Sequence, residues 1–316
     1  MTQNKHIIWC DFRVERVSPE LLKTAQDQFG QYEFKQGADA FKNARIAYGQ
    51  PNPEDLKTAE NLQWIHLTSA GYSEFDSDDI RTLFNERGIR LTNSSAVYDE
   101  PCAEHLLAMM LSLARCLPRS VKNQLNAKDW NQREQRFDAY LLKNQKVLLL
   151  GFGAIARRLA KLLQPFDMEV SALRRHPSQE KTVTIISRDE LSKVLSEADH
   201  IVDILPENDS TKHFVDREFL QQIKPGAVFY NIGRGTTVDQ IALMKALHNG
   251  NLAAAYLDVT SPEPLPPNHP LWNTPNCHIT PHSGGGHQDE FDRLLRHFLE
   301  NLKAFEEGKE LSDRVI

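Results

Sequence analysis

The sequence has few cysteines, no excess of positive charge and no long hydrophobic run, and each of these absences argues against a class of protein. Its four cysteines lie far apart without a C-x-x-C motif, so neither a disulfide framework nor a metal site is expected, and a reducing cytoplasm fits best. The formal net charge is −6 without a long basic block, so nucleic acid and anionic membrane are not expected as partners. The apolar runs at residues 7–10 and 105–114 are too short for a signal peptide or a membrane span.

The first 95 residues alternate short strand-like runs with helical patterns. A chain of 316 residues can hold two domains of ordinary size, and alternation of this kind predicts a parallel sheet covered by helices. Strands are expected at 7–10, 46–48, 62–67 and 89–91, and helices at 19–29 with Ser18 as its cap, from Pro53 onward, and at 80–86. This segment is therefore a small α/β domain in its own right.

Between Asp99 and Trp130 the apolar residues recur at helical spacing, and Pro118 should interrupt or kink the helix. Such a helix is most simply a connector between domains. Glu104 and His105 lie on it, and a histidine on a helix face is more often structural than catalytic. The apolar side of residues 104–117 can bury either within one chain or against a second subunit, and its periodicity does not decide between them.

A glycine turn stands at the start of the second half of the chain. The apolar run 147–150 leads into Gly151-Phe152-Gly153 and then into the helical pattern 154–164. Strand, turn and helix in this order form the dinucleotide-binding fingerprint G-x-G-x-x-A, with Ala156 in the third small position. Gly151 permits the tight turn, Gly153 lets the backbone approach a pyrophosphate, and Ala156 lets the helix pack close to its strand.

The alternation then continues in five strand-and-helix units, which predict a doubly wound nucleotide-binding domain. The amphipathic helix expected at Asp289–Phe305 could return to the first domain, which would make the nucleotide domain an insertion. The expected boundaries are 1–98 and 287–316 for the substrate domain and 99–286 for the dinucleotide-binding domain. Strands are expected at 168–173, 200–205, 227–232 and 253–259, and helices at 189–197, 216–223 and 239–248.

Three candidate catalytic side chains follow strands of this domain. Because ligands collect at the carboxyl ends of parallel strands, Arg234, Glu263 and His282 should reach one edge of one sheet. Each has a structural alternative: Arg234 as a solvated turn residue, Glu263 between prolines as a rigid corner, and His282 as an ordinary loop histidine. Their joint placement favours the functional interpretation.

These residues, with the glycine turn, resemble the D-isomer-specific 2-hydroxyacid dehydrogenase family over nearly the whole chain. The motifs that carry the resemblance are Gly151–Ala156, Lys224–Gly235, Asp258–Pro266 and, as a pair, His269–Trp272 with Ile279–His282. Four ordered motifs at compatible spacings are far more specific than any one of them. The resemblance implies an α/β fold of two doubly wound parallel-sheet domains, with a Rossmann dinucleotide-binding domain inserted into a smaller flavodoxin-like substrate domain.

The resemblance also implies roles for individual residues. Arg234, Glu263 and His282 correspond to the catalytic residues of the family, and Ser69-Ala70-Gly71 resembles its substrate-carboxylate loop, with Arg234 and His282 also contacting the substrate. The cofactor-binding positions would be Gly151, Phe152, Gly153, Ala154, Ile155, Arg174, Arg175, Leu205, Pro206, Ile232, Gly233 and Asp258.

The implied chemistry is consistent with the residue types. Reduction of a 2-oxo acid needs a hydride at the carbonyl carbon and a proton at its oxygen. Arg234 can bind the carboxylate and polarise the ketone, and a protonated His282, oriented by Glu263, can donate the proton. The hydride belongs to a nicotinamide cofactor.

The residues at the end of the second strand of the nucleotide domain predict which nicotinamide cofactor is used. NAD-binding domains usually carry an acid about 20 residues after the first glycine. Here Arg174-Arg175-His176 occupies that region, Arg174 stands 23 residues after Gly151, and Asp167 and Glu169 lie at the wrong end of the strand. An arginine suits the 2′-phosphate, so NADP(H) is expected in preference to NAD(H).

Glyoxylate and hydroxypyruvate are the substrates that the resemblance makes plausible, and a homodimer is the expected assembly. One alternative is a dehydrogenase of a larger D-2-hydroxy acid, because Ser283-Gly284-Gly285-Gly286 departs from the bulkier family pattern and could leave extra room or a mobile loop. A second alternative, from a different class, is a cofactor-sensing protein like the transcriptional corepressors of the superfamily.

Overall fold

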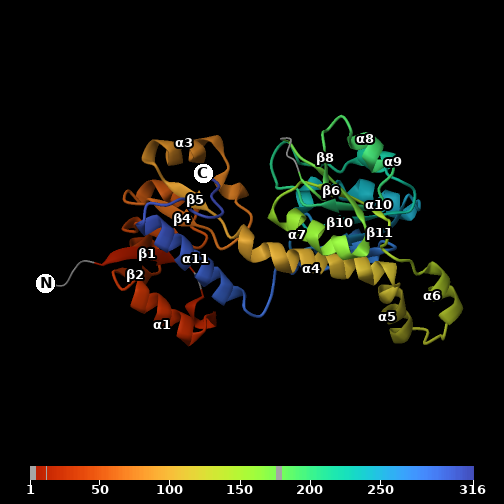
Figure 1. Cartoon of the computed structure of the whole chain (residues 1–316), viewed down its shortest axis with the longest axis horizontal. Coiled ribbons are helices and arrows are strands. Elements are labelled where there is room, and N and C mark those ends of the chain that lie inside the picture. The colour runs from red at the N-terminus through yellow and green to blue at the C-terminus, as the bar shows by residue number, and fades with distance from the viewer. Residues whose placement is uncertain (1–4, 12, 176–179) are drawn as a thin grey trace. The chain divides into compact units, whose positions relative to one another are not determined.

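A computed structural model describes residues 5–11, 13–175 and 180–316 of the chain (Figure 1). The chain divides into two compact units. Unit 1 consists of residues 1–98 and 287–316, and unit 2 consists of residues 99–286. Unit 2 is therefore inserted into the sequence of unit 1, and the chain passes between the units twice.

Unit 1 is built on a five-stranded sheet in which all the strands described are parallel. The strand order is β2-β1-β3-β4-β5, which is the flavodoxin-like order. The strands are β1 (His6–Cys10), β2 (Tyr32–Lys35), β3 (Ile46–Tyr48), β4 (Trp64–His66) and β5 (Arg90–Thr92).

The last helix of the chain completes the core of unit 1. The helices of this unit are α1 (Pro19–Gln28), α2 (Ala38–Lys42), α3 (Asp78–Arg87) and α11 (Glu290–Glu306). Phe298 of α11 is fully buried, and its ring stacks on Tyr48 at 4.2 Å and on Trp64 at 5.3 Å between centroids. Residues from both ends of the sequence thus form one hydrophobic core, which is why the C-terminal segment belongs to this unit.

Unit 2 is built on a seven-stranded parallel sheet with the order β12-β11-β10-β9-β6-β7-β8. This is the Rossmann arrangement, in which the chain runs outward from β6 to β8 and then returns to β9 on the other side of β6. A ligand crevice is expected at this reversal, at the carboxyl ends of β6 and β9. The strands are β6 (Lys146–Leu150), β7 (Glu169–Leu173), β8 (Thr184–Ile186), β9 (His200–Asp203), β10 (Ala227–Asn231), β11 (Leu252–Leu257) and β12 (Cys277–Ile279).

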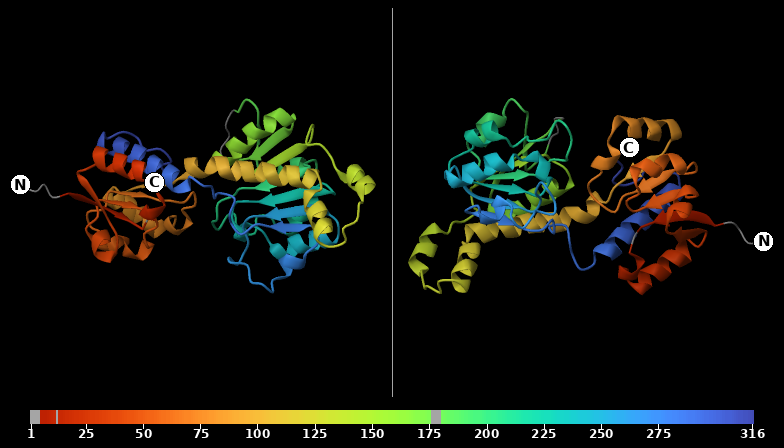
Figure 2. Two further views of the ribbon diagram at one scale, coloured as in Figure 1. Left: turned by 90° about the horizontal axis from the view of Figure 1, so that it is seen from below. Right: turned by 180° about the vertical axis from the view of Figure 1, so that it is seen from behind.

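Helices cover both faces of this sheet, and two of them extend away from it. In Figures 1 and 2, α5 and α6 extend beyond the rest of unit 2 at the C-terminal end of α4. The helices are α4 (Ser95–Ala114), which begins with the last residues of unit 1, and α5 (Leu117–Leu125), α6 (Gln132–Asp138), α7 (Ala154–Leu163), α8 (Leu191–Leu195), α9 (Arg217–Gln222) and α10 (Gln240–His248).

The structure differs from the sequence expectations at several elements. The edge strands β2 and β8 and the helices α2 and α6 were not expected. The residues from Pro53 to Thr58 form a 3-10 helix rather than an α-helix. Ser18 does not cap α1 with its side chain, because its hydroxyl donates to Asp292 Oδ2 at 2.6 Å.

The long apolar helix is interrupted at Cys116, whose φ of 55° is left-handed. α4 ends just before it at Ala114, and Pro118 lies in the first turn of α5, where its missing amide hydrogen has no partner to lose. Among the residues described, no helix combines the length and apolar character needed to cross a membrane.

Candidate active site

The turn that follows β10 is shaped by glycines that have no room for a side chain. A Cβ at Gly233 would lie 2.7 Å from the carbonyl oxygen of Leu205, and one at Gly235 would lie 2.0 Å from the carbonyl of Thr260. These contacts are with backbone atoms, so a side chain at Gly233 would push the turn away from the loop after β9, and one at Gly235 would push it away from the loop after β11. Arg234 is therefore held between two close backbone contacts, which distinguishes it from a solvated turn residue.

Two polar side chains fix the backbone of Arg234. Its carbonyl oxygen accepts hydrogen bonds from Asn231 Nδ2 at 3.0 Å and from the hydroxyl of Thr237 at 2.6 Å. Its guanidinium donates to the carbonyl of Gly233 at 2.7 Å, and the residue is half-buried. The remaining guanidinium N–H groups have the planar geometry that suits a carboxylate.

His282 and Glu263 form a hydrogen-bonded pair in the same unit. The Nδ1 atom of His282 lies 2.8 Å from Glu263 Oε2, and Glu263 Oε1 accepts the amide of Thr260 at 2.8 Å. A carboxylate accepts only, so Nδ1 carries the hydrogen and a protonated ring would offer its second hydrogen from Nε2. Both side chains are exposed enough to reach a ligand, with 54% and 37% of their surfaces accessible.

The loop that carries His282 is anchored by Asp258 at the end of β11. Its carboxylate accepts the Thr280 hydroxyl at 2.6 Å and the amides of Ser283 and Gly284, each at 2.9 Å. A Cβ at Gly284 would lie 2.8 Å from Ile232 Cδ1 and 2.9 Å from Asp258 Oδ2. The space beside Gly284 is therefore occupied by Ile232 and Asp258, and no extra room is left at this point.

His105 on α4 approaches the same group of residues. Its Nε2 atom lies 3.3 Å from the Thr280 hydroxyl and 3.8 Å from Asp258 Oδ1. Burial lowers the pKa of His105, although Asp258 opposes the shift. His105 thus contacts Thr280 and Asp258, the two residues that hold the loop of His282 in place.

The glycine turn after β6 has the features that a dinucleotide pyrophosphate requires. Gly151 has a φ of 96°, and a Cβ there would lie 3.2 Å from the carbonyl oxygen of Ile204. Gly153 precedes α7, and among the residues described no atom outside its own chain neighbours lies within 4 Å of the position that its Cβ would take. The packing of the described residues therefore leaves open space at Gly153, and the amino end of a helix is a favourable position for a phosphate.

The end of β7 carries the two arginines expected to select the cofactor. Arg174 is half-buried, Arg175 is exposed, and Arg175 donates to the Ser210 hydroxyl at 2.6 Å. His176 lies outside the described residues. The acids Asp167 and Glu169 are at the opposite end of the strand, so no acid occupies positions 173–175 where a ribose would be bound.

The Ser69-Ala70-Gly71 loop follows β4 in unit 1. Asn93 Nδ2 donates to the carbonyl of Ala70 at 2.7 Å, the Ser94 amide donates to that of Ser69 at 3.0 Å, and the Ser69 hydroxyl donates to that of Gly71 at 2.6 Å. These bonds use carbonyl groups. Within the described part of the chain, the amides of Ala70 and Gly71 donate to no other group, which leaves them available to an anion.

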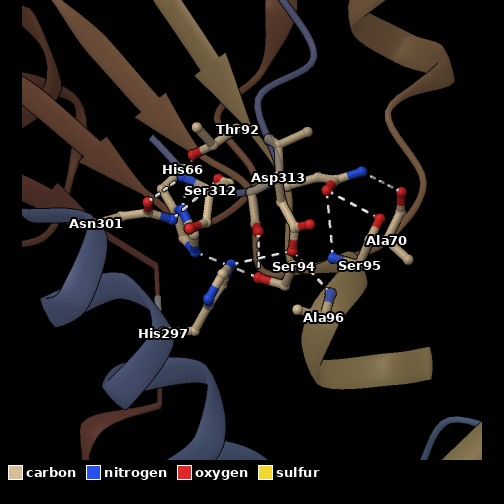
Figure 3. Close-up of polar contacts among 12 residues, drawn as sticks. His66, Ala70, Thr92, Ser94, Ser95, Ala96, His297, Asn301, Ser312 and Asp313 are labelled. Carbon is tan, nitrogen blue, oxygen red and sulfur yellow. Dashed lines mark hydrogen bonds and ion pairs between the residues drawn. The ribbon is translucent and has the colours of Figure 1, made fainter. Parts of the chain in front are cut away.

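A buried polar network lies behind this loop (Figure 3). His66 is fully buried, its Nδ1 lies 2.7 Å from the Thr92 hydroxyl, and its Nε2 lies 3.3 Å from the Ser94 hydroxyl. Ser94 donates to the carbonyl of Leu67 at 2.7 Å, so it accepts from His66 Nε2, and Thr92 donates to Nδ1. Burial, followed by the nearby His297, holds the pKa of His66 well below its usual value, and the ring is neutral.

Sequence reasoning missed the residues that support the candidate site. Asn93, Ser94 and Asn231 are ordinary polar residues whose partners are set by the fold. Asp203 follows an apolar run, and its partner Thr237 is 34 positions away in the sequence. Within the three described ranges, no group of three or more histidine, cysteine and acidic side chains could hold a metal ion.

Comparison with known proteins identifies the family. Residues 107–284 match the family described as D-isomer specific 2-hydroxyacid dehydrogenase, NAD binding domain. A human glyoxylate reductase/hydroxypyruvate reductase is 34% identical over 71% of this chain and 68% of its own length. Glyoxylate/hydroxypyruvate reductase B of Escherichia fergusonii is 30% identical over 94% of this chain and 92% of its own.

A solved structure agrees with this match over both units. The D-isomer specific 2-hydroxyacid dehydrogenase family protein of Aeromonas salmonicida has a TM-score of 0.80 at 27% identity, and the match covers 100% of this chain and 99% of that one. The chain belongs to the D-isomer specific 2-hydroxyacid dehydrogenase family. It is an NAD(P)-dependent oxidoreductase of small 2-oxo and 2-hydroxy acids, and the expected fold class is confirmed.

Proposed function

We propose that the protein reduces a small 2-oxo acid of the glyoxylate or hydroxypyruvate type to the D-2-hydroxy acid, with NADPH as the preferred reductant. The observation that carries the proposal is the 2.8 Å pair of His282 and Glu263 in the same unit as Arg234, which is fixed between two glycines. The names of the human and Escherichia fergusonii relatives support this substrate class.

Arg234 binds the substrate carboxylate and polarises its ketone. The guanidinium is always charged and planar, so it can bind one carboxylate oxygen and the ketone oxygen of a 2-oxo acid at once. The resemblance to the family assigns the Ala70 and Gly71 amides of unit 1 to the substrate carboxylate. The carbonyl oxygens of these two residues accept hydrogen bonds from Asn93 Nδ2 and from the Ser69 hydroxyl, which fixes the loop and leaves its amides available. These contacts define which carbonyl group is presented for reduction.

His282 supplies the proton. Glu263 accepts the Nδ1 hydrogen and orients the ring, so the protonated imidazole donates from Nε2 to the oxygen that becomes the hydroxyl. Asp258 holds the backbone that carries His282 through the Ser283 and Gly284 amides. A nicotinamide cofactor, when bound, would supply the hydride for the carbonyl carbon.

The fingerprint residues and the two arginines bind the cofactor. Gly151, Phe152 and Gly153 hold the pyrophosphate with the amino end of α7, and the loop with Leu205 and Pro206 and the turn with Ile232 and Gly233 flank it. Arg174 and Arg175 bind the 2′-phosphate, because an acid that would prefer a free ribose hydroxyl is missing from their positions. Arg174→Asp should shift the ratio of kcat/KM values toward NADH, and an unchanged ratio would remove Arg174 from this role.

The decisive experiment is a panel of 2-oxo acids assayed with NADPH and with NADH, with nicotinamide absorbance as the signal. The expected result is highest kcat/KM for glyoxylate or hydroxypyruvate with NADPH. A preference for a larger acid would favour the alternative enzyme, although the packing of Gly284 against Ile232 argues against extra room there. Tight NADPH binding without turnover of any acid would favour a cofactor sensor.

We also infer that two copies of the chain associate through α5 and α6. These helices and the segments beside them expose several large apolar side chains within unit 2. Large apolar side chains exposed together on two helices joined by hydrogen bonds favour an interaction surface, and a second copy would cover it symmetrically. We call this group the α5–α6 surface: Leu117, Val121, Leu125, Trp130, Phe137 and Leu141.

A further inference from the structure

The buried carboxyl group of Asp203 is connected to Arg234 through one intervening residue, Thr237. Asp203 ends β9, and Thr237 lies in the turn after β10; both are 0% exposed. The Thr237 hydroxyl is 2.6 Å from Asp203 Oδ2 and also 2.6 Å from the carbonyl oxygen of Arg234. The second carboxyl oxygen, Oδ1, accepts the amide of Leu205 at 3.0 Å.

Counting hydrogens shows that this arrangement is incomplete if Asp203 is ionised. A threonine hydroxyl has one hydrogen, whereas a carboxylate and a carbonyl oxygen are both acceptors. Two contacts of 2.6 Å from one hydroxyl are both hydrogen bonds only if one partner donates. A hydrogen on Asp203 Oδ2 meets this requirement: Asp203 donates to Thr237, and Thr237 donates to the Arg234 carbonyl.

We propose that Asp203 and Thr237 are positioning residues for Arg234, and that they act through a chain of hydrogen bonds that requires a protonated Asp203. The proposal rests on the substrate-binding role assigned to Arg234. The chain fixes the peptide group that follows Arg234, which sets the direction from which the guanidinium reaches the substrate. Asn231 holds the same carbonyl from the other side, so loss of Thr237 loosens the turn without dismantling it.

The surroundings of Asp203 favour the protonated form. Burial raises the pKa of Asp203 to about 7, and the hydrogen bonds from Thr237 and the Leu205 amide only partly offset that shift. In register with Asp203 on the neighbouring strands are Leu150 of β6 and Asn231 of β10, neither of which titrates. Among the residues described, no charged side chain contributes to its pKa.

The chain of hydrogen bonds should therefore break within the physiological pH range. When Asp203 loses its hydrogen, the Thr237 hydroxyl turns toward the carboxylate and the Arg234 carbonyl loses one donor. The KM for glyoxylate in the wild-type enzyme should rise roughly two- to tenfold as the pH passes about 7, which is the effect of one net hydrogen bond. The Asp203→Asn variant isolates the contribution of Asp203, because it removes this one carboxyl group and leaves the other ionisable groups of the site in place.

Three variants test the chain through the pH dependence of KM for glyoxylate at saturating NADPH. In Asp203→Asn the amide donates to Thr237 at every pH while its oxygen accepts Leu205, so KM should stay low and the change near pH 7 should vanish. In Thr237→Val, KM should be high at every pH. Thr236→Val is the matched control, because the buried Thr236 hydroxyl has no hydrogen-bond partner among the residues described; its profile should match the wild type.

A second measurement tests the protonation of Asp203 without turnover. A carboxyl whose folded pKa is raised contributes stability that is fully present below its unfolded pKa of about 3.9 and is lost as the pH rises through about 7. The unfolding midpoint of Asp203→Asn relative to wild type should therefore rise between about pH 4 and about pH 7 and level off above it.

Two results would overturn the proposal: a KM profile of Asp203→Asn identical to wild type, or equal profiles for Thr237→Val and Thr236→Val. Parallel unfolding curves for wild type and Asp203→Asn would overturn the protonated state. If the wild type reduces no 2-oxo acid, the proposed function has failed instead, and the unfolding comparison still decides the state of Asp203.

Discussion

His282 is the residue to which the proposed chemistry assigns the proton, and its removal separates catalysis from binding. His282→Ala leaves the Asp258 anchor and the glycine turn in place, so NADPH binding should remain close to wild type. Reduction should fall by about 10² to 10⁴, the usual contribution of a positioned general acid. Steady-state rates and NADPH titration by fluorescence provide the measurements.

The matched control is His248→Ala, because His248 is an exposed histidine in the same unit whose ring, among the residues described, bonds to the Met244 carbonyl of its own helix and to no other group. It should retain wild-type activity. Undiminished activity in His282→Ala would show that another group donates the proton.

The buried His66 gives unit 1 a pH-dependent stability. Because its folded pKa is depressed, its stabilising contribution is present above the unfolded pKa of about 6.5 and is lost as the pH falls below that value. His66→Gln places an uncharged acceptor near Thr92 and an uncharged donor near Ser94. The fall in thermal midpoint between about pH 7.5 and about pH 5 should be smaller in this variant than in wild type.

His200 supplies the internal reference for that comparison. It is buried in unit 2 with a pKa lowered to about 4, and it bonds to Tyr230 and Gln145. Its contribution persists in His66→Gln, so part of the acid sensitivity should remain. Equal falls in the thermal midpoint for wild type and variant would mean that the pKa of His66 does not change on unfolding.

At the scale of elements, two glycine turns should respond differently to alanine: the turn between β6 and α7, at Gly153, and the turn after β10, at Gly235. Gly153 has a negative φ and open space around its Cβ position. In Gly153→Ala, a small loss at a helix cap is offset by lower entropy of the unfolded chain, so stability should stay within about 1 kcal/mol. NADPH binding should weaken roughly tenfold or more, equivalent to about 1.4 kcal/mol.

Gly235→Ala should lower the stability of the fold, whereas Gly153→Ala should leave it nearly unchanged. Its Cβ would lie 2.0 Å from the Thr260 carbonyl, so the loops must separate and stability must fall. Denaturant unfolding and cofactor titration of both variants make the comparison. Normal NADPH affinity in Gly153→Ala would remove the ligand explanation of this glycine.

The elements that the sequence predicted well have strong local signals. The run 147–150 followed by Gly151 and the periodic pattern of α7 identify strand, turn and helix from neighbouring residues alone. The edge strand β2 was missed because three of its four residues are exposed and no apolar alternation remains. The Asp203–Thr237 pair was missed for a different reason, because it exists only once β9 and β10 lie side by side.

At the scale of the whole molecule, the structure shows which apolar residues of the stretch around 104–117 are buried within the single chain and which are exposed. The apolar side of α4 includes Ala103, Leu106, Met110 and Ala114, which are all buried within the single chain. The corresponding stripe of α5, formed by Leu117, Val121 and Leu125 at intervals of four residues, remains exposed. Other apolar residues of α4, among them Leu107 and Leu111, are half-buried, so the most exposed apolar side chains of this region lie on α5, on α6 and beside them.

The α5–α6 surface predicts a dimer that can be dissociated without unfolding the chain. Val121 and Leu125 are 55% and 74% exposed, so the double substitution Val121→Asp and Leu125→Asp should leave the fold of each unit intact. In a dimer the same change places four carboxylates in an apolar interface, where burying unpaired charge is strongly unfavourable. Sedimentation velocity should show a dimer for wild type and a monomer for the double variant.

A matched substitution tests whether the effect belongs to this surface. Ile241 on α10 is 62% exposed in the same unit but lies outside the α5–α6 surface. Ile241→Asp adds charge to an equally exposed apolar position, so it should still sediment as a dimer. A monomeric wild type would contradict the dimer itself. Dissociation by Ile241→Asp, with a dimer persisting in the double variant, would move the interface from α5 and α6 to the face of α10.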